Sequence, residues 1–359
     1  MGAGFSEVCA FSKATGESQL FKPKKNQSER LEFDLLDAVL LDFPAEVFSL
    51  KDLKVLKFPT DHVHKLPQAL TKLKELEELV LQTSDWWCKS ADDLKKEGVG
   101  LMEVPRFVTS LSRLRVLSIY GSPRLKNIFE IPLFQLSNLV ELEIVKCGIT
   151  DLPSTTSSDK FQLSKLNLRG NPLRWIKLSS WLQPTAMRIL ILSDCNLNET
   201  PPDICDMQNL EKLDLSGNKN LHSFSSLACV RLSNLTCLNL SNCDLCGAPP
   251  LMNSLRNLNF LNLSYNKNLE LFPAAACGGL INLKLLNLSW CNIQTLPNEL
   301  CRMTSLEKLY LMGNKNLVTF PCVTLRSLKL LDVRQCDIQQ LPMEIESRQH
   351  LEVWDWRSS

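Results

Sequence analysis

The sequence has few of the residues on which catalytic and metal sites are usually built, with 4 His and 3 Tyr among 359 residues. The patterns G-x-x-x-x-G-K-[ST], G-x-S-x-G and H-E-x-x-H do not occur in it. Cys243-x-x-Cys246 has no second Cys or His pair at the spacing that a zinc site requires. We therefore predict that the chain is not an enzyme and that it holds no cofactor and no metal.

An excess of charge and long apolar runs are also missing. Lys and Arg number 40 against 39 Asp and Glu, a formal charge of +1, which excludes binding to nucleic acid by bulk charge. No apolar run reaches the ~18–20 residues of a membrane helix, and the first residues lack the apolar core of a secretory signal. Because no export signal accompanies the 14 Cys, we expect reduced thiols in a cytoplasmic protein without a nucleic-acid partner.

Leucine is abundant, at 69 of 359 residues, and it is periodic. The pattern L-x-x-L-x-L-x-x-(N/C)-x-L recurs every 22 to 25 residues, apart from one spacing of 38, and a degenerate copy begins near residue 30. The thirteen clear copies start at Leu53, Leu76, Leu114, Leu139, Leu163, Met187, Leu210, Leu235, Leu258, Leu283, Leu306, Leu328 and Leu351.

This pattern predicts the fold. Side chains alternate along a strand, so both leucines of L-x-L face the same side, and one turn alone cannot bury them. Stacked turns bury them in a continuous core. We predict an α/β solenoid of about 13–14 turns, shaped as a horseshoe. A parallel sheet forms its concave face, and short helices, 3₁₀ turns and loops form its convex face.

On these residues the chain resembles the leucine-rich repeat family over roughly residues 30–356. Turns with L-P-x-x-L, such as Leu66–Leu70 and Leu296–Leu300, resemble the intracellular repeats of Ras-suppressor and Scribble-type proteins. That resemblance implies an intracellular signalling scaffold or regulator that binds a protein, such as a small GTPase or a phosphatase, on its concave face. The turn S-G-N-K-N-L at 216–221 also resembles plant-type resistance receptors. The alternative is therefore an effector- or ligand-sensing domain of a multidomain immune-type receptor.

The ninth position of the pattern alternates between Cys and Asn. The alternating residues are Cys147, Asn171, Cys195, Asn218, Cys243, Asn266, Cys291, Asn314 and Cys336. A metal or redox array would need these side chains to converge, whereas successive turns project them separately. We predict that Asn bonds the loop amides and that Cys is a small buried filler with a weak donor.

The domain boundaries follow from where the pattern starts and breaks. Residues 1–29 are predicted to be a flexible tail and 30–359 the repeat domain. Trp354 and Trp356 are placed in the two strand Leu positions of the last turn, where they cap the core or lead into more repeats beyond residue 359. An insertion at 82–105 carries a short helical pattern at 91–97 and two Trp. Trp86 fits an interior position of its turn, whereas the surplus Trp87 is a candidate partner contact.

The predicted concave wall carries a candidate protein-binding patch of aromatic, amide and charged residues. Its members are Phe260, Asn262, Tyr265, Asn287, Trp290, Lys308, Tyr310, Asp332 and Arg334. The alternative is that the recurring Asn-Leu-Ser only fills the strands and that its amides bond one another along the sheet.

Residues 1–6, Met-Gly-Ala-Gly-Phe-Ser, fit the rule for N-myristoylation at Gly2. One acyl chain gives only marginal membrane binding. We therefore predict peripheral membrane association only if Gly2 is modified, and an unmodified tail otherwise.

Overall fold

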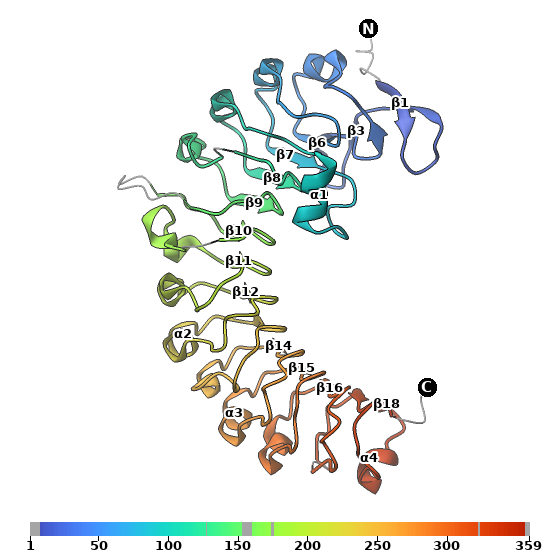
Figure 1. The fold of residues 1–359 in the computed structure, drawn as a ribbon, viewed down its shortest axis with the longest axis vertical. Coiled ribbons are helices and arrows are strands. Elements are labelled where there is room, and N and C mark those ends of the chain that lie inside the picture. The colour runs from blue at the N-terminus through green and yellow to red at the C-terminus, as the bar shows by residue number, and fades with distance from the viewer. Residues whose placement is uncertain (1–7, 127, 153–159, 174–175, 322–323, 356–359) are drawn as a thin grey trace. The chain divides into compact units, whose positions relative to one another are not determined.

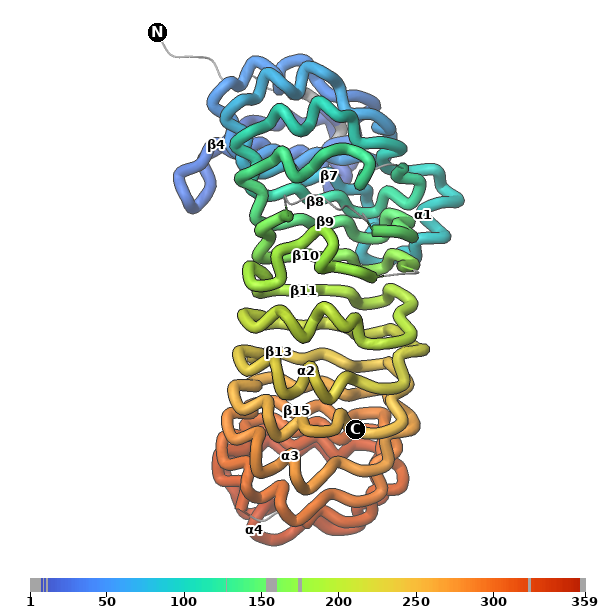
Figure 2. The backbone as a smooth tube through the Cα atoms, turned by 90° about the vertical axis from the view of Figure 1, so that its left-hand side faces the viewer, coloured from blue at the N-terminus to red at the C-terminus, as the bar shows by residue number. Residues whose placement is uncertain are grey.

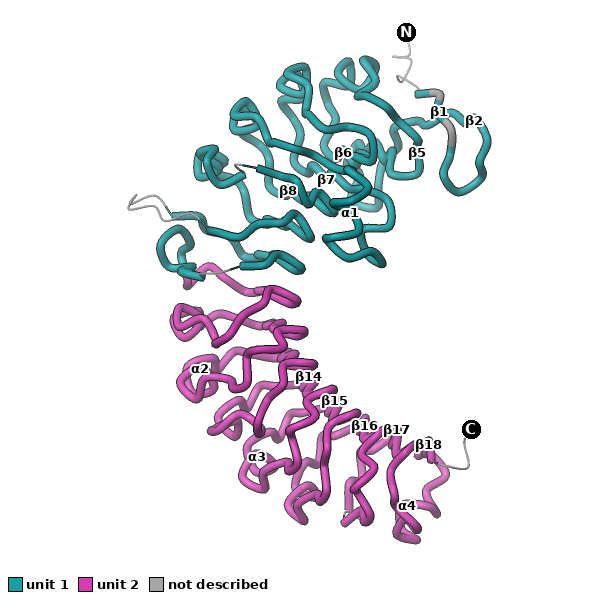
Figure 3. Tube along the Cα trace, viewed as in Figure 1, with its two compact units in different colours: residues 1–183 teal, residues 184–359 magenta. Residues whose placement is uncertain are grey.

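The computed structural model describes residues 8–126, 128–152, 160–173, 176–321 and 324–355. The chain divides into two compact units, residues 1–183 and 184–359 (Figure 3), where the sequence predicts one repeat domain. Both units consist of the same kind of turn, and Figure 2 shows these turns stacked one on another within each unit.

Unit 1 contains six turns, each with one strand of a parallel sheet in the order β4-β6-β7-β8-β9-β10. Their bounds are β4 Leu31–Asp34, β6 Val55–Pro59, β7 Glu78–Gln82, β8 Val116–Tyr120, β9 Glu141–Val145 and β10 Lys165–Asn167. The leucines of successive turns pair in register, for example Leu79 with Leu117 and Leu117 with Leu142.

Unit 2 continues the pattern with eight parallel strands in chain order. Their bounds are β11 Ile189–Ile191, β12 Lys212–Asp214, β13 Cys237–Asn239, β14 Phe260–Asn262, β15 Leu285–Asn287, β16 Lys308–Tyr310, β17 Leu330–Asp332 and β18 Glu352–Trp354. Within this unit the strands lie on the inner side of the turns and the helices on the outer side (Figure 1). The fourteen described turns confirm the open, parallel repeat solenoid.

The return segments are short, as period 3 predicts. The 3₁₀ segments are η1 Ala45–Ser49, η2 Gln68–Lys72, η3 Arg106–Ser110, η4 Leu133–Gln135, η5 Leu178–Ser180, η6 Pro184–Ala186, η7 Pro202–Asp206, η8 Met252–Ser254 and η9 Asn298–Arg302. The α-helices are α1 Ala91–Glu97, α2 Ser226–Arg231, α3 Ala274–Gly279 and α4 Met343–Glu346. Proline precedes several of them, as Pro67 precedes η2 and Pro297 precedes η9. Both prolines are N-cap residues with an extended backbone, and their carbonyls accept the first hydrogen bond of the segment, from Leu70 N and Leu300 N at 3.0 Å.

The cysteine and asparagine alternation is structural, as predicted. Asn266 is fully buried, and its Oδ1 accepts from the N–H groups of Cys243 and Leu245, both at 3.0 Å. Its Nδ2 donates to the carbonyls of Leu240 and Leu263. The thiol of Cys243 donates to Leu215 O of an earlier turn at 3.1 Å. Burial raises the pKa of this thiol to about 12.

The flexible tail predicted at 1–29 is wrong for residues 8–29. β1 Val8–Ser12 and β2 Ser18–Phe21 form an antiparallel hairpin that also pairs with β5 Ala38–Val39. β3 Lys24–Lys25 runs antiparallel to β4 and ends the sheet. The cause is the open edge of the first turn, whose unpaired backbone groups and core need a cover.

The last turn is shifted by one residue from the predicted register. Val353 pairs with Leu331 and points inward, so Trp354 pairs with Asp332 on the exposed face. The smaller Val occupies the inward position, and the indole of Trp354 lies 4.7 Å from the guanidinium carbon of Arg334. Trp356 lies outside the described residues.

Candidate protein-binding surface

The exposed face of the unit 2 strands, called here the sheet face, presents two rows of side chains in register. The first row reads Ile189, Lys212, Cys237, Phe260, Leu285, Lys308, Leu330 and Glu352. The second row reads Ile191, Asp214, Asn239, Asn262, Asn287, Tyr310, Asp332 and Trp354. These registers bring together Phe260, Asn262, Asn287, Lys308 and Tyr310, which the sequence predicts as one patch.

The first row contains an apolar strip of which the predicted site includes only Phe260. Cys237, Phe260 and Leu285 are consecutive in register and half-buried, and a lysine follows at each end, Lys212 and Lys308. Both lysines are exposed. The signal in the sequence was the residue directly before the first Leu of each L-x-L, compared from turn to turn.

In the second row, the side-chain oxygens of the asparagines accept hydrogen bonds from the backbone of their own turn. Asn262 Oδ1 accepts from Ser264 N at 3.1 Å, and Asn287 Oδ1 accepts from Ser289 N at 2.9 Å. These bonds close the turn that ends each strand, so the amides do not bond one another along the sheet. Neither Asn262 Nδ2 nor Asn287 Nδ2 has a hydrogen-bond partner in the described part of the chain. Both donors remain available on the sheet face.

In the turns of β8 to β17, the residue two positions after the second apolar residue of the L-x-L pattern adopts a left-handed conformation. Glycine occupies this position at Gly170, Gly217 and Gly313, where φ is +72°, +75° and +79°. Tyr265 and Trp290 occupy it in β14 and β15 turns, with φ of 59° and 56°. Such a backbone is unfavourable for a bulky side chain.

The two aromatic residues stack on each other. Their ring centroids lie 6.2 Å apart with an interplanar angle of 12°, and Tyr265 is 53% exposed. Trp290 reaches over the next turn, where a Cβ on Gly313 would lie 2.6 Å from its Cδ2. The pair therefore forms an aromatic platform at the rim of the sheet face. We call Phe260, Asn262, Tyr265, Asn287, Trp290, Lys308 and Tyr310 the sheet-face patch.

Asp332 and Arg334, which the sequence also predicts as partner contacts, bind each other. Arg334 Nε and Nη2 donate to Asp332 Oδ1 and Oδ2 at 2.9 and 2.8 Å. Asp332 is only 3% exposed, so the prediction that it contacts a partner is wrong. Its carboxylate orients Arg334 beside Trp354 instead, because a buried charge needs a partner.

The insertion in unit 1 is folded against the ends of its strands. Residues 91–97 form the predicted helix α1, and Trp87 is 69% exposed. Trp86 is half-buried and stacks on Tyr120 at 4.5 Å, so it does not fill an interior position. Lys146 Nζ donates to the Trp86 carbonyl at 2.9 Å. Trp87 stays a predicted contact, and Gly2 lies outside the described residues.

The exposed face of the last unit 1 strands carries charged side chains at the positions that hold the apolar strip in unit 2. Lys165 Nζ lies 2.6 Å from Glu143 Oε1 and 3.4 Å from Glu141 Oε2. Burial opposes the charge on Lys165, but the hydrogen bond and charge of Glu143 outweigh it and raise the pKa of the lysine. Burial, followed by the charge of Glu143, raises the pKa of Tyr120.

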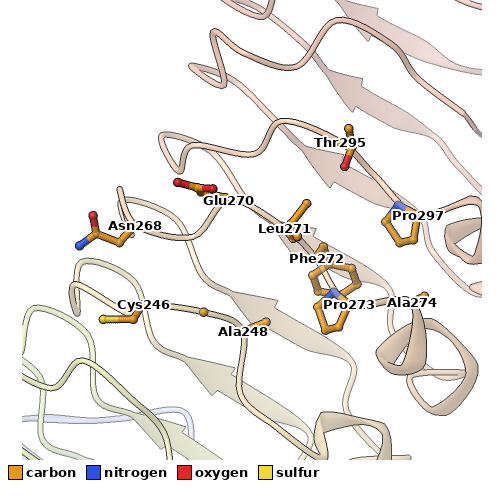
Figure 4. A pocket seen from close by; sticks show the side chains of 11 residues that line it. Cys246, Ala248, Asn268, Glu270, Leu271, Phe272, Pro273, Ala274, Thr295 and Pro297 are labelled. Atoms are coloured by element: carbon orange, nitrogen blue, oxygen red, sulfur yellow. The ribbon is translucent and has the colours of Figure 1, made fainter.

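A hollow of about 620 Å³ lies between neighbouring loops of unit 2 (Figure 4). Its lining includes Leu271, Phe272 and Pro273, with Glu270 as its only carboxylate and Cys246 as its only thiol. No histidine or lysine lines it, so no base is paired with the thiol there. In the described ranges, no group of three His, Cys, Asp or Glu side chains is placed to hold a metal ion. None of the described helices has both the length and the apolar character needed to cross a membrane.

Models of one repeat family match unit 2: "Leucine rich repeat" matches residues 185–245, and a second model of that description matches 282–303. The chain is a leucine-rich repeat protein. The fold and the periodicity agree with this assignment along both units. Leucine-rich repeat domains offer extended surfaces to protein partners, and the chain is accordingly a protein-interaction module.

The leucine-rich repeat chain is also similar to curated proteins. It is 31% identical to the rat volume-regulated anion channel subunit LRRC8D over 225 residues, which is 60% of this chain and 26% of that protein. It is 27% identical to the human volume-regulated anion channel subunit LRRC8A over 232 residues, 60% of this chain and 28% of that protein. The chain thus matches about a quarter of these relatives' length.

Solved leucine-rich repeat structures share the fold. An internalin of Listeria monocytogenes matches with a TM-score of 0.59 and 15% identity, over 95% of this chain and 90% of its own. A leucine-rich repeat protein of Leptospira interrogans matches with a TM-score of 0.51 and 22% identity, over 92% of this chain and 99% of its own. At these identities the likeness concerns the fold alone.

Proposed function

We propose that the chain is a non-catalytic protein-binding module whose partner contacts the sheet-face patch of unit 2. The observation that carries this proposal is the stack of Tyr265 and Trp290 at two left-handed positions. A non-glycine residue in that conformation costs roughly 1–2 kcal/mol. In the other described turns of unit 2 the equivalent position holds glycine or a polar side chain, and the β14 and β15 turns alone carry aromatic rings there; the residues are Asp194, Gly217, Asn242, Gly313 and Gln335. Strained residues cluster at functional sites, where the strain serves a task other than folding.

The chemistry of the patch indicates the kind of partner. Phe260, Leu285 and the aromatic platform offer apolar contact, which Trp and Tyr supply well at protein interfaces. The Nδ2 groups of Asn262 and Asn287 are donors directed at acceptors of the partner. Lys308 at the end of the apolar strip favours a carboxylate there. A segment with apolar side chains, exposed carbonyls and an acidic end complements this surface.

The test compares two glycine variants in quantitative affinity purification with mass spectrometry. The double variant Tyr265→Gly with Trp290→Gly removes the platform and relieves the backbone. We expect it to lose the specific partner by about tenfold or more, as hot-spot aromatics do. Its melting temperature stays the same or rises, since the strain is relieved.

Asn242→Gly is the matched control, because Asn242 is exposed and has φ of 55° at the same position of a neighbouring turn. It relieves the same backbone without removing an aromatic ring, so it retains the partner. If the double variant keeps the partner, or if it loses partner and stability together, the platform serves the fold and the proposal is wrong.

The finer description is also a proposal: an intracellular, cytoplasmic scaffold or regulator in signalling, whose partner is a small GTPase or a phosphatase. It rests on the resemblance of the L-P-x-x-L turns. The alternative is a sensing domain of a multidomain immune-type receptor, and the match to about a quarter of each similar anion channel subunit is consistent with a repeat domain that forms part of a larger protein. Imaging of a tagged full chain separates these. A cytosolic signal with a GTPase or phosphatase among the platform-dependent partners supports the scaffold.

A further inference from the structure

Unit 1 carries a second surface of different chemistry, a hollow of about 640 Å³ beside the insertion. Its lining is Lys65, Lys95, Met102, Glu103, Pro123, Arg124, Leu125 and Lys126. Four of these eight side chains are cationic and one is acidic. None of them belongs to the sheet-face patch, so this surface is independent of the function proposed above.

Backbone hydrogen bonds fix the hollow across three consecutive turns. Met102 N donates to His64 O at 3.0 Å, and Lys126 N donates to Met102 O at 2.8 Å. Glu103 and Lys126 form a parallel β-bridge. The end of the insertion therefore lies like an extra strand between the loops that follow β6 and β8, and the cations are held on a rigid frame.

Arg124 attaches the helix of the insertion to this frame. Its Nη2 donates to the carbonyl of Lys95 in α1 at 2.9 Å. Gly98 ends α1 with φ of +75°, and a Cβ on it would lie 3.3 Å from Arg124 Nη1. The guanidinium thus lies against the last turn of α1, next to the lysine that it positions.

The positive charge of the hollow is only partly neutralised. Glu103 lies 3.7 Å from Lys65, and both side chains are well exposed. No carboxylate of the described residues lies within ion-pair distance of Lys95, Arg124 or Lys126. These three positive charges are unbalanced in a chain whose formal charge is +1.

The floor of the hollow is apolar. Met102 is 38% exposed, whereas Leu125 is 6% exposed and Pro123 is buried. An exposed methionine beside cations offers an adaptable contact for an apolar side chain. The adjoining hollow shares Leu125 and Lys126 but also has Glu130 and Asp151 in its lining, so the positive surface ends there.

We propose that this hollow binds an acidic peptide segment of a protein partner. Carboxylates of the segment pair with Lys95, Arg124 and Lys126, and one apolar side chain between them rests on Met102. Charge complementarity selects the acidic segment and speeds its association. The apolar floor distinguishes such a segment from a simple anion, which would gain nothing from Met102.

The test measures fluorescence anisotropy of the full chain with three labelled twelve-residue peptides. The first has Asp and Glu around one central Leu, the second has Ser in place of Leu, and the third has Asn and Gln in place of the acids. We expect binding of the first, about threefold or more weaker binding of the second, and none of the third.

Two double variants locate the binding. Lys95→Glu with Lys126→Glu weakens the first peptide about tenfold or more. Lys72→Glu with Lys74→Glu changes the net charge equally at exposed positions in and after η2, and it leaves the affinity within about twofold. Met102→Ser removes the preference for the Leu peptide over the Ser peptide. Melting curves verify that each variant is folded.

Three results would overturn the proposal. Equal loss in both double variants means that net charge alone attracts the peptide. No loss in Lys95→Glu with Lys126→Glu places the peptide elsewhere. The third result has two parts: the chain shows no preference among the three peptides, and it binds phosphatidylserine vesicles in a way that Lys95→Glu with Lys126→Glu abolishes. That result would assign the hollow to an anionic membrane surface.

Discussion

The indole of Trp290 occupies the space above Gly313 that a side chain would fill. A Cβ built on Gly313 would lie 2.6 and 2.7 Å from two indole atoms, and the backbone there has φ of +79°. Gly313 thus meets two demands at once, the left-handed turn and the place for the ring. The sequence shows Gly313 only as one glycine of a repeat, and its relation to Trp290 comes from the stacking of turns.

We predict that Gly313→Ala displaces Trp290 and destabilises unit 2 by about 1–2 kcal/mol. Acrylamide quenching of tryptophan fluorescence reports the displacement, and chemical denaturation reports the stability. Gly278→Ala is the control, because its φ is not positive and a Cβ there would meet nothing within 4 Å. An unchanged quenching profile in Gly313→Ala contradicts the contact.

We predict a large loss of stability when an asparagine at the ninth position of the repeat pattern is truncated. Asn266→Ala leaves the N–H groups of Cys243 and Leu245 and two carbonyls without their buried partner. Each such group costs about 1–3 kcal/mol, so we expect a loss of about 3 kcal/mol or more. Asn268→Ala, at an exposed position, loses one bond to Asp244 Oδ1 and changes stability by less than about 1 kcal/mol. Urea denaturation measures the free energy of unfolding of both variants. A similar decrease in both would contradict the structural role of the buried asparagines.

The cysteines predict a sharp division in thiol reactivity. Burial raises the pKa values of Cys147, Cys243 and Cys291 to about 12, whereas Cys88 and Cys246 are exposed. Because the thiolate is the reactive form, the buried thiols stay unmodified by iodoacetamide at pH 8 until the protein unfolds. Peptide mapping by mass spectrometry checks this. Early labelling of Cys243 would show that its turn opens in the native state.

The contact between the β1–β2 hairpin and the first turns of unit 1 is predicted to be sensitive to acid. Asp61 accepts from Lys13 Nζ of the hairpin at 2.8 Å and from Ser84 N of the insertion at 2.7 Å. Burial raises the pKa of Asp61, but these partners outweigh it and the pKa lies below its usual value. The contact therefore stabilises the folded state above the unfolded pKa of about 3.9 and is lost as the pH falls through the folded value.

Asp61→Asn accordingly lowers stability at pH 7 by about 1–3 kcal/mol, and its effect is smaller at pH 3, below the unfolded pKa. The exposed Asp52→Asn serves as the control at both pH values. Urea titrations at the two pH values provide the comparison. A difference between Asp61→Asn and the parent that persists undiminished at pH 3 would contradict the assigned charge.

The fold was predictable because one period of 22 to 25 residues specifies the strand, its buried face and the stacking together. The N-terminal hairpin was not, because β1 and β2 are too short to show a pattern and are held by tertiary contacts such as Lys13 to Asp61. The predicted register of the last turn was wrong, because Val353 and not Trp354 takes the inward position.

The candidate site was predictable in part. Period 2 places Phe260, Asn262 and Tyr310 on the exposed face correctly. The pattern does not reveal which polar groups bind within the protein, so the pairing of Asp332 with Arg334 was missed. Backbone dihedral angles are also invisible in the pattern, although two aromatic residues, Tyr265 and Trp290, at a position that holds Gly217 and Gly313 in other turns gave a signal.

Photocrosslinking tests the partner-binding surface most directly. A benzophenone amino acid at Leu285 lies on the sheet face, and the same group at Leu227 lies on the exposed side of α2, on the outer side of the turns. Irradiation of the full chain with its purified partner is predicted to give an adduct from position 285 and none from position 227. An adduct from position 227 alone would contradict the account, because the partner would then bind the outer side of unit 2.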